Sequence, residues 1–225
     1  MWKSFVQLFF PKTCISCVDL LPPSEEFLCV ACRHQLPLTI HFEQPNNEVF
    51  RIFEGHLPIT HGAAMFYFDK QTGVQNLVHL LKYKKQQRIG TFLGEWLGKL
   101  LVQHHWKPDM IVAVPLHPKK QRQRGYNQLT KFGQAIATEL QIPYFEDMLI
   151  RTSYQISQSK LNKLERAAIR ENTFVLNPKY QLHNQTILLI DDIITTGSTL
   201  KQCGKALNDN NQIKIQIASI GWTVL

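Results

Sequence analysis

The segment Ile187–Leu200 constrains the fold of this 225-residue chain more than any other segment. It begins with Ile-Leu-Leu-Ile, a short continuous apolar run that is typical of a buried parallel strand. Two adjacent carboxylates, Asp191 and Asp192, follow the run, and a Thr-Thr-Gly-Ser-Thr turn then leads into a helix. Since open α/β sheets bind ligands at the carboxyl ends of their strands, we expect a binding site here.

These side chains indicate a ligand that carries both a sugar and a phosphate. A Thr- and Ser-rich turn before a helix offers backbone N–H groups and hydroxyls, which suit a phosphate. Carboxylates one step away suit sugar hydroxyls. The alternative is a strand end with acidic residues beside an ordinary Thr/Ser helix cap. The length and completeness of the pattern favour the binding site.

The same segment resembles the signature of type I phosphoribosyltransferases, which bind 5-phosphoribosyl-1-pyrophosphate (PRPP). The resemblance implies that Asp191 and Asp192 hold the ribose hydroxyls and act in catalysis. It also implies that the turn wraps the 5′-phosphate. The turn residues are Thr195, Thr196, Gly197, Ser198 and Thr199.

The rest of the chain alternates strand and helix patterns. We expect strands over 63–68, 110–114, 187–190 and 214–220, a short strand within 145–151, and helices over 73–84, 90–105, 127–140, 160–170 and 198–207. Such alternation predicts an α/β fold with a parallel sheet and flanking helices, of the type I phosphoribosyltransferase-like kind. We divide the chain into an N-terminal module (1–36), a linker with one short helix (37–60) and the phosphoribosyltransferase-like domain (61–225).

Four of the five cysteines form two Cys-x-x-Cys pairs near the N-terminus: Cys14, Cys17, Cys29 and Cys32. Two such pairs can place four thiolates around one tetrahedral ion, and Zn²⁺ is the expected metal. The alternatives are disulfides, which need an oxidising compartment, and redox-active pairs. We therefore expect a small structural zinc module. The fifth cysteine, Cys203, falls at core spacing on a helix and is expected to be a small buried apolar residue.

A second candidate site follows the predicted strand at 110–114, which breaks at Pro115. The loop after it is strongly basic, and its charged residues are Lys119, Lys120, Arg122 and Arg124. Because the loop leaves the same sheet edge as the acidic pair, we expect it to bind the pyrophosphate of PRPP. The alternative is a solvated basic loop.

The stretch Val114–Gln128 resembles the ComF family of competence proteins, and their GntX-like relatives, in its Pro-Leu-His-Pro and Arg-Gly-Tyr-Asn-Gln motifs. ComF proteins pair a four-cysteine zinc finger with a phosphoribosyltransferase-like domain, and both parts occur here in that order. A further match is Gln158–Arg166, followed by Asn172 and Phe174. Gln158, Arg166 and Asn172 either face the base side of the ligand or form a polar helix face.

The chain has a formal net charge of +8, which favours polyanionic partners. A basic cluster after the first predicted helix offers Lys82, Lys84, Lys85 and Arg88 as nucleic-acid contacts. The alternative is that these cations stabilise the helix C-terminus. No apolar run is long enough to span a bilayer, and Met1–Phe10 lacks the features of a secretory signal, so we expect a cytoplasmic protein.

The resemblances imply a PRPP-binding protein that is required for natural competence and handles incoming single-stranded DNA. Mg²⁺ with PRPP, structural Zn²⁺ and proteins of the competence machinery are the implied cofactors and partners. The alternative is a metabolic phosphoribosyltransferase, an enzyme of the glycosyltransferase class, that transfers phosphoribose to a base or amine. A third reading is a PRPP sensor without catalysis.

Overall fold

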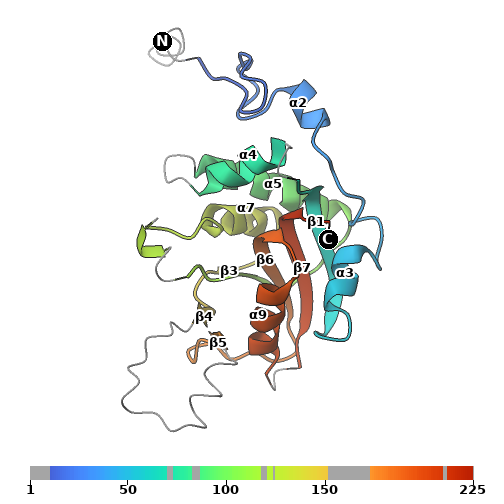
Figure 1. The fold of residues 1–225 in the computed structure, drawn as a ribbon. Coiled ribbons are helices and arrows are strands. Elements are labelled where there is room, and N and C mark those ends of the chain that lie inside the picture. Colours follow the sequence, from blue (N-terminus) through green and yellow to red (C-terminus); the bar gives the residue numbers. More distant parts are fainter. Residues whose placement is uncertain are drawn as a thin grey trace.

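The computed structural model describes residues 11–69, 73–82, 87–117, 121–123, 125–151, 173–209 and 212–224. A five-stranded sheet lies at the centre, in the order β1-β7-β6-β2-β3, and its neighbouring strands are parallel (Figure 1). The strands are β1 Ile59–Tyr67, β2 Met110–Ala113, β3 Tyr144–Phe145, β6 Thr186–Ile194 and β7 Lys214–Trp222. The expected α/β class, a parallel sheet with flanking helices, is confirmed.

A separate two-stranded antiparallel sheet pairs β4 (Leu149–Arg151) with β5 (Phe174–Leu176). The single short strand predicted at 145–151 is therefore two strands: the end of β3 at Phe145 and β4 at Leu149–Arg151. The chain bends at 146–148, between β3 on the edge of the main sheet and β4 in the small one. The sequence suggested one strand because both pieces are short and adjacent.

The described part of the chain forms the helices α2 Val30–His34, α3 Glu48–Phe53, α4 Gly73–Leu81, α5 Arg88–Gln103, α7 Thr130–Leu140 and α9 Ser198–Asn208. Helices α3, α7 and α9 pack on the main sheet, while α4 packs on α5 and α5 on α7 in a layer of helices (Figure 1). Helix α5 packs tightly against α7, because Gly94 and Gly98 face α7. A Cβ at Gly94 would lie 2.7 Å from the Cβ of Ala135, and one at Gly98 would lie 2.6 Å from that of Glu139. Small residues here let the two backbones approach.

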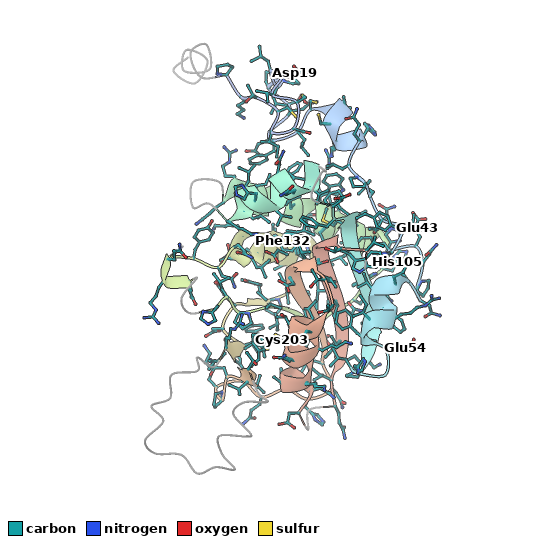
Figure 2. The ribbon with its side chains drawn as sticks, viewed as in Figure 1. Asp19, Glu43, Glu54, His105, Phe132 and Cys203 are labelled. Atoms are coloured by element: carbon teal, nitrogen blue, oxygen red, sulfur yellow. The ribbon has the colours of Figure 1, made fainter. Side chains whose placement is uncertain are left out.

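The core is centred on β6 and its neighbours. Ile187–Ile190 are fully buried, as the continuous apolar run predicts. Phe132 on α7 is also fully buried and is labelled in Figure 2. The helices at 73–81, 88–103, 130–140 and 198–208 lie close to the predicted ranges.

The segment 37–60, expected to be a linker, carries α3, which packs on β1. Val49 and Phe53 of α3 are fully buried. Asn47 caps the helix by accepting from the Phe50 N–H (3.0 Å), and its amide donates to the carbonyl of Gly62 in β1 (2.7 Å). Within this segment the short helix is thus built into the core, while the division of the chain into domains stays a prediction.

Candidate functional site

The acidic pair lies inside β6, which continues past Asp191 and Asp192 and ends at Ile194. The prediction that the strand ends at Ile190 is wrong, because β6 continues to pair with β7 beyond that point. Asp191 lies opposite Ser219, and Ile193 opposite Gly221. On the other side, β2 ends at Ala113, opposite Ile190. The acids therefore stand where β6 extends past β2, at the carboxyl edge of the sheet.

Asp191 and Asp192 are half-buried and hydrogen-bonded locally. Asp191 Oδ1 accepts from the Asp192 N–H, and Asp192 Oδ1 accepts from the Ile193 N–H, both at 2.8 Å. Burial, together with the charge of Asp192, raises the pKa of Asp191 well above its usual range. Two adjacent carboxyl groups at this edge of the sheet can accept hydrogen bonds from the hydroxyls of a ligand.

Gln128 also reaches the acidic pair, although it is not among the residues that the sequence pointed to. Its Nε2 donates to Asp192 Oδ2 at 2.5 Å. The signal that could have found it is the Arg-Gly-Tyr-Asn-Gln motif, which the sequence identified only as a family resemblance.

The turn at 195–199 follows β6 directly and leads into α9. The side chains of Thr195, Thr196, Ser198 and Thr199 are exposed, whereas Gly197 is buried with φ +73°. The Thr196 hydroxyl accepts from the Ser198 N–H at 3.4 Å. Exposed hydroxyls at the N-terminus of an 11-residue helix suit an anion such as a phosphate.

The turn rests on α3. A Cβ atom at Gly197 would lie 2.6 Å from Ile52 Cγ2 and 2.9 Å from Phe53 Cε1, so the turn backbone is in close contact with both side chains. Left-handed backbone at this position also favours glycine. The fold therefore uses α3 to hold the turn beside the acidic pair.

Parts of the basic loop lie outside the described residues: Lys119, Lys120 and Arg124. Arg122 is described, and its side chain is exposed in the helical turn at 121–123. Gln158, Arg166, Asn172 and the predicted helix at 160–170 also lie outside the described residues. Their roles stay predictions.

A cavity of about 430 Å³ lies between the end of β2 and the small sheet. Its lining residues are Pro115, Leu116, Gln121, Asn127, Glu146, Asp147, Leu149, Ile150, Arg151 and Asn177. Asn127, which lines the cavity, is followed by Gln128, whose side chain donates to Asp192. None of the lining residues was predicted from the sequence as a site residue, because they come from five separate stretches of the chain. The mixture of apolar side chains with amide, carboxylate and guanidinium groups is typical of a small-molecule site.

Cys203 is fully buried on α9, as expected, and is labelled in Figure 2. Burial raises the pKa of its thiol well above the usual value, and Asp191 adds to the effect. A thiol in this environment is unreactive.

The sulfur atoms of Cys14, Cys17, Cys29 and Cys32 all lie within 4.8 Å of one another. The Sγ atoms of Cys17 and Cys29 are 3.7 Å apart, close to the edge of about 3.8 Å in a tetrahedron with Zn–S bonds of ~2.3 Å. Although burial opposes the effect, hydrogen bonds from backbone N–H groups of Cys17, Cys29 and Ser16 lower the pKa of Cys14 to about 6. The cluster is therefore compatible with a structural zinc ion.

The cysteine module contacts α5. The Arg33 guanidinium lies 4.4 Å from the ring centroid of Trp96, and the Phe27 ring lies 5.5 Å from that of Phe92. Glu26 forms an ion pair with Arg88, one of the predicted nucleic-acid contacts. Of the other predicted contacts, Lys82 is half-buried after α4, while Lys84 and Lys85 lie outside the described residues.

None of the helices in the described part of the chain combines the length and apolar character needed to cross a bilayer. No protein-family model matches the chain.

Curated relatives include competence and DNA-utilization proteins. Competence protein F of Haemophilus influenzae is 33% identical over 111 residues, covering 49% of this chain and 48% of that protein. DNA utilization protein YhgH of Escherichia coli (strain K12) is 29% identical over 147 residues, covering 63% of each. Competence protein ComFC of Streptococcus pneumoniae is 33% identical over 121 residues, covering 54% of this chain and 49% of that protein. The chain spans 48% to 63% of the length of these relatives. The resemblance to the ComF family is confirmed by these named homologues.

Among solved structures, the adenine phosphoribosyltransferase from Leishmania donovani is similar with a TM-score of 0.38 and 14% identity, covering 70% of this chain and 83% of that chain. The enzyme from Leishmania tarentolae gives a TM-score of 0.37 and 12% identity, covering 80% and 89%.

Proposed function

We propose that this chain is a PRPP-binding ComF-type protein that is required for natural competence and handles incoming single-stranded DNA. The observation that carries the PRPP site is the order of groups at one sheet edge. Asp191 and Asp192 stand near the end of β6, where it extends past β2, and the exposed hydroxyl turn at the N-terminus of α9 begins three residues after Asp192.

Each part of the ligand has a chemically suitable partner in this proposal. The acidic pair accepts hydrogen bonds from the ribose hydroxyls, and the 195–199 turn donates to the 5′-phosphate. Arg122, together with Lys119, Lys120 and Arg124, binds the pyrophosphate. Mg²⁺ bound with PRPP supplies charge neutralisation for the leaving pyrophosphate.

The four-cysteine cluster holds a structural Zn²⁺ in this proposal. The sulfur spacing supports it because it fits four ligands around one tetrahedral ion, and the N–H donors to Cys14 support it because they stabilise a thiolate there. Residues 11–36 have few fully buried apolar side chains of their own, so the metal contributes most of their folding free energy.

The role in DNA handling is supported by the names of the relatives and by the net charge of +8. Lys82, Lys84, Lys85 and Arg88 are the proposed contacts with the nucleic acid. The contact acts in the cytoplasm and together with proteins of the competence machinery. Because such contacts release counterions, affinity for single-stranded DNA falls steeply with salt concentration.

The 430 Å³ cavity favours a second candidate function, transfer of phosphoribose to a base or small amine. The cavity is lined by Asn127, the residue before Gln128, and offers both hydrogen-bonding and apolar groups. Incubation with PRPP, Mg²⁺ and a pool of nucleobases and amines tests this function by pyrophosphate release. Release with one acceptor supports the transferase, while PRPP binding without any release supports a sensor.

The PRPP site is tested by calorimetry with Asp191→Asn plus Asp192→Asn. We expect the double variant to lose PRPP binding while keeping its thermal stability. Glu43→Gln plus Glu54→Gln removes the same two charges from exposed positions (Figure 2) and should bind as the unmodified chain does. Unchanged PRPP affinity in the first variant contradicts the site.

The competence role is tested in a strain that lacks the protein. We expect a large loss of transformation with normal growth, and restoration by the unmodified gene. An ordinary transformation frequency in that strain contradicts the role.

A further inference from the structure

Three consecutive residues after the basic loop each bind a different element of the fold. The Tyr126 hydroxyl donates to the carbonyl of Leu81, the last residue of α4, at 2.9 Å. The Asn127 amide donates to the carbonyl of Val114, just after β2, at 3.4 Å. We call the segment Tyr126–Gln128 the bracket, because it ties α4, β2 and β6 together.

The backbone of the bracket is fixed from both sides. Asn127 is only 4% exposed, and its Oδ1 accepts from the Leu129 N–H at 3.0 Å. Its carbonyl accepts from the N–H of Thr130, where α7 begins, also at 3.0 Å. The backbone that carries the Gln128 side chain is therefore held in place by these hydrogen bonds.

The side chain of Gln128 completes the hydrogen bonding of Asp192. One carboxylate oxygen of Asp192 accepts from the Ile193 N–H, and the other accepts from Gln128 Nε2. With both oxygens engaged, rotation of the carboxylate is restricted. A pre-oriented carboxylate binds a ligand with less loss of conformational entropy than a free one.

A neutral amide suits this position chemically. Asp191 already stands beside Asp192, so a third carboxylate would add repulsion. A lysine or arginine would neutralise Asp192 and compete with the ligand for its oxygens. An amide N–H supplies one donor and leaves the charge in place.

We propose that Gln128 is a positioning residue of the ribose site, which orients Asp192 toward a ligand hydroxyl through the hydrogen bond to Oδ2. This proposal rests on the proposed PRPP function. The Arg-Gly-Tyr-Asn-Gln motif thereby has a physical role. Tyr126 and Asn127 fix the backbone, and Gln128 uses this fixed position to hydrogen-bond Asp192 of β6.

The first test uses Gln128→Met, which keeps the length of the side chain and removes the donor. Calorimetry measures the affinity of the variant for four ligands: PRPP, ribose 5-phosphate, 2-deoxyribose 5-phosphate and inorganic pyrophosphate. We expect PRPP affinity to fall about tenfold, since a lost hydrogen bond to a charged group has roughly that effect. The preference for ribose 5-phosphate over its 2-deoxy analogue should fall, while pyrophosphate affinity stays unchanged. A merely structural role would weaken all four ligands together.

The second test uses Gln128→Glu, which has the same shape and donates only when protonated. Compared with Gln128→Met at each pH, its PRPP affinity should recover as the pH falls from 7 to 5. Parallel curves for the two variants contradict the proposal. The control is Gln134→Met, on the exposed face of α7, which should match the unmodified chain.

The outcomes separate this inference from the proposed function. If the unmodified chain does not bind PRPP, the proposed function fails. If it binds PRPP and Asp192→Asn abolishes binding, but Gln128→Met retains full affinity and sugar preference, the positioning role alone is overturned.

Discussion

Gly197 lies directly against Phe53: a Cβ atom added to the glycine would be 2.9 Å from Cε1 of the ring. The two residues are far apart in the chain: Gly197 lies in the turn before α9, and Phe53 is the last residue of α3. The contact connects α3, which carries no predicted site residue, to the turn that we propose binds the phosphate. The stability of α3 and the shape of the turn are therefore linked.

The substitution Gly197→Ala should weaken phosphate binding and destabilise the fold. The left-handed backbone costs about 1–2 kcal/mol with any Cβ, and the collision with Ile52 and Phe53 adds to it. Chemical denaturation and calorimetry with PRPP measure the two effects. Gly55→Ala is the matched control, because Gly55 has the same φ of +73° with no atom within 4 Å of the added Cβ. Equal losses in the two variants would contradict a close contact at Gly197.

Phe53→Ala should destabilise the protein by about 3–5 kcal/mol, since the ring is fully buried and a cavity would remain. Because the ring supports Gly197, PRPP affinity should fall as well. Urea denaturation and calorimetry measure both. Phe50→Ala, at a half-buried position of the same helix, should cost less and leave PRPP affinity intact. A stable Phe53 variant with full affinity would show that α3 does not support the turn.

Removing the metal should unfold residues 11–36 and leave the central sheet folded. Zinc contributes about 10–16 kcal/mol to small modules of this kind, whereas the sheet has its own buried core. Metal analysis should find one zinc per chain, and hydrogen exchange after chelation should rise only in the module. Cys32→Ser should lower the zinc content, and Cys203→Ala should not. Full zinc content in Cys32→Ser would contradict the assignment of the ligands.

Arg33→Ala should loosen the module on α5, because the guanidinium lies over the ring of Trp96. The loss is about 0.5–1 kcal/mol for an exposed cation–π contact. Limited proteolysis should cleave the module faster, with the zinc content unchanged. His34→Ala, at the neighbouring exposed position of α2, is the control. Equal cleavage rates for both variants would argue against the contact.

Stability should fall as the pH drops below about 6.5, the usual pKa of histidine in an unfolded chain. Burial lowers the pKa of His41 in the folded state, although Glu48 opposes this effect. The unfolded chain therefore binds a proton first, so this stability is complete above pH 6.5 and is lost as the pH falls toward the folded pKa. His61, also lowered by burial, contributes in the same direction.

Urea denaturation at pH 7.5 and 5.5 measures the difference. His41→Phe, which cannot be protonated, should show a smaller difference than the unmodified chain, and the remainder should come from His61 and other groups. His105→Phe leaves both buried histidines in place and should behave as the unmodified chain does. If His41→Phe keeps the full pH dependence, His41 is not its source.

Much of the fold could be predicted from local patterns in the sequence. The run Ile187–Ile190 predicted a buried strand and forms the middle of the sheet. Helical spacing located α5 and α9 to within a few residues. The cysteine pairs predicted a cluster, and their sulfur atoms do meet. These features depend on neighbouring residues, so period and spacing are sufficient to find them.

Other features depend on partners far away in the chain. The strand β6 extends through Asp191 and Asp192 because β7 continues beside it, which the composition of β6 does not encode. Similarly, the segment around α3 has little periodicity, and it is ordered by packing on β1.

The sequence by itself determined which chemical groups this protein offers: an acidic pair, a hydroxyl turn and two Cys-x-x-Cys pairs, each specified by a few adjacent residues. Only the tertiary structure decided what holds them. It brought Gln128 to Asp192 across 64 positions and Phe53 to Gly197 across a still longer separation. Local sequence specifies which groups are present. The residues that hold these groups in place do so through contacts between distant segments. Such contacts produce no periodic pattern or fixed spacing in the sequence.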